Sequence, residues 1–104
     1  MKVKFVGLVL AIIGLQLSAW AAGDANNGKI IAQGCVGCHG TDGVSKQPMH
    51  PNLAGQKENY LIWQLSAFRD GSRPSHIMNH VAEGLDDQAI ADLSAYYSQL
   101  GACQ

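Results

Sequence analysis

The chain has 104 residues, of which 47% are hydrophobic and 14% are charged. This length is enough for one domain, and the composition excludes a disordered polar chain. The formal net charge of −1 excludes a strongly basic nucleic-acid-binding protein, and three cysteines are too few for a disulfide-rich scaffold.

The first 21 residues have the organisation of an export signal. A basic start precedes an apolar run over Phe5–Leu17, and small residues at Ala19 and Ala21 form an A-x-A cleavage site. The run is shorter than the roughly 20 apolar residues that a membrane-spanning helix needs. We therefore predict a signal peptide over residues 1–21, with an uncleaved N-terminal anchor as the alternative. The domain then covers residues 22–104, and its expected location is a bacterial periplasm.

The remaining chain has helical patterning. Apolar residues recur at helical spacing, for example at Leu61, Leu65 and Phe68, and no segment alternates with a period of two. The predicted fold class is therefore all-α, without a sheet. The expected elements are a helix capped by Asp24 that runs to about Gln33, a long loop over Gly40–Gln56, and helices over Lys57–Arg69, Ser75–Glu83 and Asp86–Leu100.

The segment Cys35-Val36-Gly37-Cys38-His39 carries the chemistry. Its pattern, C-x-x-C-H, is typical of covalent c-type haem attachment. Residues three and four apart share one face of a helix, so Cys35 and Cys38 can meet the two vinyl groups of one haem while His39 reaches the iron. A haem also suits an 83-residue mature chain (104 − 21), because domains of this size often need a cofactor to supplement their core.

Three other interpretations of this motif are weaker. A thioredoxin-like redox pair favours a strand–helix context, which the pattern does not indicate. A zinc site would need a fourth ligand such as Cys103, and no second C-x-x-C pair exists. A structural disulfide between Cys35 and Cys38 would close a strained small loop. We therefore favour haem.

The sixth position of the iron decides the function. The chain after residue 21 has only two methionines, Met49 and Met78. Met49 follows His39 by ten residues and would have to cross the ring edge quickly, whereas Met78 follows by thirty-nine, which is enough chain to reach the other face. We favour Met78, with His76 or His80, Met49 and an open position as alternatives.

In these motifs the chain resembles the class I c-type cytochromes, in particular the small bacterial monohaem forms and single halves of dihaem periplasmic cytochromes. The resemblance implies a fold of about four short helices around one covalent haem c. It also implies that the Pro51 carbonyl accepts a hydrogen bond from His39 and that Met78 is the sixth ligand. The residues that carry the resemblance are Gly28, Cys35–Gly40, Gly43, Pro51–Gln56, Tyr60, Gln64-Leu65, Phe68-Arg69, Gly71, Met78, Leu93 and Ala95-Tyr96-Tyr97.

The same resemblance implies how two helices pack. It places Gly28 and Ile31, in the first helix, against Leu93 and Tyr96 of the last one. Trp63 is expected in the haem pocket or the core rather than in an electron relay.

His/Met ligation fills both axial positions and is typical of an electron carrier rather than an enzyme. The predicted function is a periplasmic one-electron carrier with transient redox donors and acceptors. One alternative is a haem subunit of a periplasmic dehydrogenase, such as a sulfide- or alcohol-oxidising flavoprotein complex, and another is a haem peroxidase or gas sensor. Cys103 has no intramolecular partner left, so we expect an unpaired thiol or a disulfide to a second copy or a partner subunit, and we favour the unpaired thiol.

Overall fold

The computed structural model describes residues 2–7, 9, 11, 14 and 22–101. The predicted cleavage site at Ala21 and the residue Cys103 lie outside the described residues. Within the described part, every regular element is a helix and there is no strand, as the patterning predicts. No helix in that part is long and apolar enough to cross a membrane.

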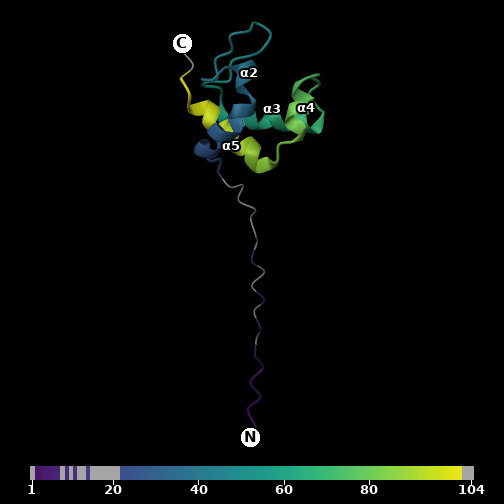
Figure 1. Cartoon of the computed structure of the whole chain (residues 1–104). Helices are drawn as coiled ribbons and strands as arrows, with labels where there is room; N and C mark the ends of the chain where they lie inside the picture. Colours follow the sequence, from purple (N-terminus) through teal and green to yellow (C-terminus); the bar gives the residue numbers. More distant parts are fainter. Residues whose placement is uncertain (1, 8, 10, 12–13, 15–21, 102–104) are drawn as a thin grey trace.

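Five α-helices and one 3₁₀ turn form the domain (Figure 1). The four helices expected from patterning are present, and the additional one is the short α2 within the C-x-x-C-H motif. The helix expected from Ser75 begins later, at Met78, because Ser75 and Asn79 first form a hydrogen-bonded turn. The bounds are α1 Ala25–Ile31, η1 Ala32–Gly34, α2 Val36–His39, α3 Glu58–Asp70, α4 Met78–Glu83 and α5 Asp87–Gln99.

Aspartate side chains cap the first and last helices, at Asp24 as predicted and at Asp86 as the structure shows. The Asp24 carboxylate accepts hydrogen bonds from the backbone N–H groups of Asn26 and Asn27, and the Asp86 carboxylate accepts one from Ala89 at 2.7 Å. These bonds satisfy N–H groups that a helix leaves without partners at its start. Local sequence therefore sets where α1 and α5 begin.

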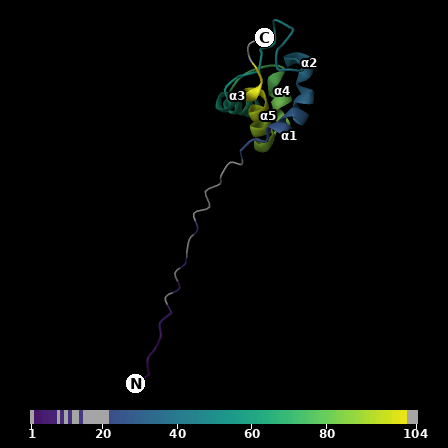
Figure 2. The same ribbon diagram turned by 90° about the vertical axis from the view of Figure 1, so that its left-hand side faces the viewer.

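Helix α1 lies across α5, while α3 packs against both α4 and α5 (Figures 1 and 2). Gly28 makes the first crossing possible, since a Cβ there would collide with the backbone carbonyl of Asp92 and come within 2.8 Å of the Tyr96 Cβ. The expected contact with Tyr96 is therefore present, and the backbone at Asp92 is the closest neighbour. The buried core cluster next to this crossing consists of Ala32, Leu61, Leu93, Tyr96 and Tyr97.

Candidate haem-binding site

The C-x-x-C-H segment forms one compact turn. Cys35 lies between η1 and α2, and the His39 N–H donates to the Cys35 carbonyl at 2.9 Å. Gly40, at a φ of 85°, ends the turn in a conformation that L side chains rarely adopt. Cys35 is half-buried and Cys38 exposed, and both thiols are free. The turn thus presents two thiols and one imidazole from five consecutive residues.

His39 is buried, and its Nδ1 atom lies 2.8 Å from the Pro51 carbonyl oxygen. A proton on Nδ1 would be donated to that carbonyl, which leaves Nε2 as the nitrogen able to bind a metal. The long loop that carries Pro51 is tied to the motif by Ser45. The Ser45 N–H donates to Asn52 Oδ1 at 2.7 Å, and its hydroxyl donates to the Cys38 carbonyl at 3.1 Å.

A cavity of about 600 Å³ lies beside this turn. Its size falls within the roughly 300–1,000 Å³ of cofactor and ligand pockets. The five residues predicted from sequence to bind the haem or to orient its ligand all line this cavity. They come from three parts of the chain: the motif turn, the long loop and α4. They are Cys35, Cys38, His39, Pro51 and Met78.

The cavity suits a haem on the chemistry of its lining. Two thiols, an imidazole with a free ring nitrogen and a thioether meet the needs of covalent attachment and iron ligation. Apolar side chains of α3 and α5, including Leu61, Leu65 and Leu93, line the cavity as well. The alternative ligands Met49 and His76 also line it, but Met49 is 86% exposed. His80 is not part of the lining.

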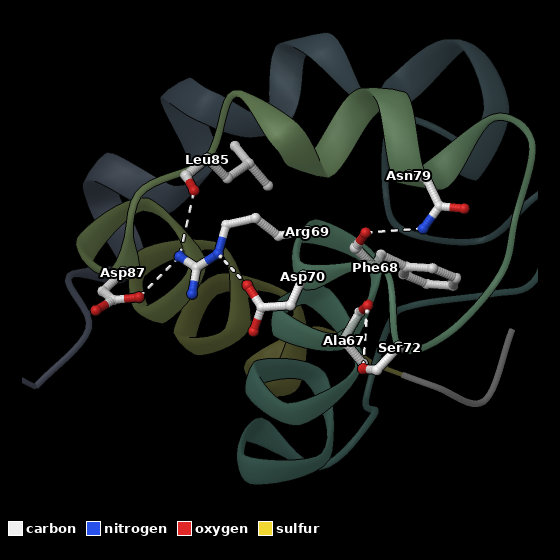
Figure 3. A network of polar contacts seen from close by, with 8 residues as sticks. All are labelled: Ala67, Phe68, Arg69, Asp70, Ser72, Asn79, Leu85 and Asp87. Carbon is white, nitrogen blue, oxygen red and sulfur yellow. Dashed lines mark hydrogen bonds and ion pairs between the residues drawn. The ribbon is translucent and has the colours of Figure 1, made fainter.

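An asparagine positions the segment around Met78, and sequence analysis missed it. The Asn79 side chain accepts from the Ser75 N–H at 2.6 Å and donates to the carbonyls of Phe68 and Arg73 at 2.8 and 2.9 Å. Figure 3 shows the bond from Asn79 to Phe68 at the end of α3. The Met78 N–H donates to the Ser75 hydroxyl at 3.1 Å. These hydrogen bonds fix the turn that carries the half-buried residue Met78.

Tyr97 of α5 covers the inner end of the motif. It is buried, lines the cavity, and lies beside the Cys35 thiol, but its hydroxyl makes no well-formed hydrogen bond among the described residues. Burial raises the pKa of the Tyr97 hydroxyl and that of the Cys35 thiol. Burial thus favours the protonated form of both groups.

The expectation for Trp63 was wrong. Its side chain is 66% exposed and does not line the cavity. At 100° per residue, Trp63 lies on the side of α3 opposite to Leu61 and Leu65, which face inward. It instead packs edge-to-face on Tyr60, with ring centroids 5.9 Å apart.

Comparison with known proteins finds a family and several relatives that this chain resembles. The family model described as "Cytochrome c" matches residues 25–101. Cytochrome c-554(548) of Halomonas halodenitrificans is 48% identical over 80 residues, which cover 74% of this chain and 96% of that protein.

Two further relatives are longer than this chain. The crystal structure of reduced cytochrome c4 from Pseudomonas stutzeri superposes with a TM-score of 0.73 and 38% identity, covering 77% of this chain and 47% of that one. A protein of Stutzerimonas stutzeri named "Thiosulfate dehydrogenase electron acceptor" is 37% identical over 70 residues, covering 64% of this chain and 32% of that protein. This chain thus spans about half the length of the cytochrome c4 structure.

Proposed function

We propose that this chain, which belongs to the cytochrome c family, is a periplasmic monohaem carrier of single electrons. The domain of this family carries one covalently attached haem c and transfers electrons rather than catalysing a reaction. The observation that supports the proposal most is the convergence of Cys35, Cys38, His39 and Met78 on one cavity. The chain has a single C-x-x-C-H motif, which matches one haem.

We assign the residues of the site as follows. Cys35 and Cys38 would hold the haem through two thioether bonds, and His39 would bind its iron while the Pro51 carbonyl accepts a hydrogen bond from His39 Nδ1. Met78 would be the second protein ligand of the iron. The bound haem supplies the Fe(III)/Fe(II) couple, and two protein ligands leave no open position for oxygen or peroxide. This is why we favour a carrier over a peroxidase or gas sensor.

We further propose that residues 1–21 direct export and that residues 22–104 form the cytochrome domain in the periplasm. The basic start, the apolar run and the A-x-A site support this assignment. Cys103 is assigned no part in the haem site, and we propose that it is an unpaired thiol, with a disulfide to a second copy or to a partner subunit as the alternative.

A second candidate is an electron-transfer subunit of a periplasmic dehydrogenase. The relative named as an electron acceptor of thiosulfate dehydrogenase supports a redox enzyme as the partner. Gel filtration of native extract separates the two candidates. A free carrier elutes at the size of the monomer, whereas a subunit elutes together with its dehydrogenase.

Substitution of the two methionines tests the central assignment. Met78→Ala should abolish the weak charge-transfer band of oxidised protein that arises from a methionine–iron bond, and it should let carbon monoxide bind the reduced iron. Met49→Ala is the matched control and should preserve the band, because Met49 is 86% exposed. Loss of the band in Met49→Ala but not in Met78→Ala would overturn the assignment.

A further inference from the structure

The charged residues that line the cavity differ in their balance from those of the chain as a whole. Among the described residues that line it, Arg73 is the only lysine or arginine, and there is no aspartate or glutamate. The chain as a whole has more acidic than basic residues, eight against seven. A haem adds two propionate carboxylates, and a carboxylate next to protein is costly unless it is paired or solvated. Arg73 is therefore the one fixed positive charge available to a propionate in this cavity.

The Arg73 side chain is held against α3. Its guanidinium carbon lies 4.5 Å from the centroid of the Phe68 ring, and Nη1 donates to Gln64 Oε1 at 2.7 Å. Gln64 and Phe68 line the same cavity. The backbone of Arg73 is fixed too, since its N–H donates to the Ala67 carbonyl at 3.1 Å. An arginine ordered in this way loses less side-chain entropy when it binds an anion.

Arg73 has no acidic partner among the described residues, in contrast to Arg69. Arg69 donates to Asp87 at 2.7 Å and to Asp70 at 3.2 Å (Figure 3), and it does not line the cavity. A guanidinium has five N–H donors, and a single side-chain hydrogen bond, to Gln64, occupies Arg73. The charge and most of the donors of Arg73 therefore remain available.

We propose that Arg73 binds a propionate carboxylate of the haem, with Gln64 and Phe68 orienting its guanidinium. The inference rests on the proposed function, because it requires the haem to occupy this cavity. Arg73 is a positioning residue in this role. Its positive charge also favours the reduced iron, which carries one positive charge fewer than the oxidised iron.

Three variants of the full-length holoprotein test the proposal. Arg73→Gln should shift the redox equilibrium toward ferric iron by about two- to tenfold, where tenfold equals 59 mV for one electron. It should also alter the propionate bending modes in resonance Raman spectra. Arg73→Lys keeps the charge and should retain most of the potential. Arg69→Gln removes one positive charge outside the cavity and should leave both measurements unchanged.

The result that overturns the proposal is a potential and a Raman spectrum of Arg73→Gln that equal those of Arg69→Gln. If in addition only Arg73→Gln slowed electron transfer to an acidic redox protein, Arg73 would belong to a docking surface instead. Failure of the proposed function is distinguishable, because haem would then be extracted by acid–acetone from the parent protein as well as from the variants.

Discussion

At the scale of single residues, Asn79 joins the end of α3 to the turn that precedes α4. Its amide binds the carbonyl of Phe68 at the end of α3, the carbonyl of Arg73 and the N–H of Ser75. A polar group that loses its partner on removal of this amide costs about 1–3 kcal/mol when buried. Since Met78 adjoins Asn79 in the chain, the same bonds determine where the proposed ligand lies.

We expect Asn79→Ala to loosen the Met78 segment without removing the haem. The free energy of unfolding should fall by about 1–3 kcal/mol, because three hydrogen bonds are lost at once. The methionine–iron charge-transfer band should disappear at a lower temperature than in the parent, which absorbance during heating measures. Asn59→Ala is the control, since Asn59 is exposed on α3. Equal melting of the band in the two variants would contradict this role of Asn79.

At the scale of elements, the crossing of α1 and α5 depends on a buried carboxylate. Asp92 is 2% exposed. It accepts hydrogen bonds from the Asp24 N–H at 2.7 Å, Asn27 Nδ2 at 2.7 Å and Gln88 Nε2 at 2.8 Å. The bond from Asn27, followed by those from Asp24 and Gln88, lowers the pKa of Asp92 despite its desolvation. Asp92 thus joins the start of the domain to its last helix.

This carboxylate should make stability depend on pH in the acid range. The folded pKa of Asp92 is below its unfolded value, so its contribution is complete above the unfolded pKa, near 3.8. The contribution is lost as pH falls through the folded pKa. Asp92→Asn places an amide against three donors and should cost about 1–3 kcal/mol at pH 7.

Thermal unfolding at several pH values measures the effect. The gap in Tm between the parent and Asp92→Asn should be widest at neutral pH and should narrow below about pH 4. Glu83→Gln, an exposed carboxylate changed in the same way, serves as the control. A gap that stayed constant from pH 7 to pH 3 would show that the Asp92 charge is not what stabilises the crossing.

At the scale of the whole molecule, the haem cavity and the hydrophobic core share a wall. Leu61, Leu93 and Tyr97 belong to the buried cluster and also line the cavity of about 600 Å³. A domain of this size buries a smaller share of its surface on folding than a larger domain does. A bound haem would complete the core on that side and so contribute directly to folding.

Removal of the two cysteines proposed to attach the haem should therefore abolish cooperative folding. Cys35→Ala/Cys38→Ala is expected to retain part of its helical circular dichroism but to show no sharp thermal transition, because the cavity wall would face water. Cys103→Ser is the control and should keep the haem and the transition. Non-reducing electrophoresis of the parent and this control also reports whether Cys103 links two chains. A cooperative transition in the haem-free double variant would contradict the proposed contribution of haem to the core.

The sequence by itself determined features that depend on neighbours along the chain. The C-x-x-C-H motif specifies haem c through the spacing of five residues, and the caps at Asp24 and Asp86 begin their helices through bonds that span two or three residues. The all-α class also follows from local periodicity. Such features can be predicted from the sequence because the interacting groups lie within about one helical turn of each other along the chain.

Only the tertiary structure decided which side chains meet across the fold. Asp92 binds residues 65 and 68 positions away, and Asn79 reaches Phe68 from another helix. Trp63 is exposed because α3 is oriented by contacts with α4 and α5, and Arg73 lies at the cavity because its turn folds back on α3. No local pattern encodes these contacts, since each depends on how packed helices bring distant residues within hydrogen-bonding distance.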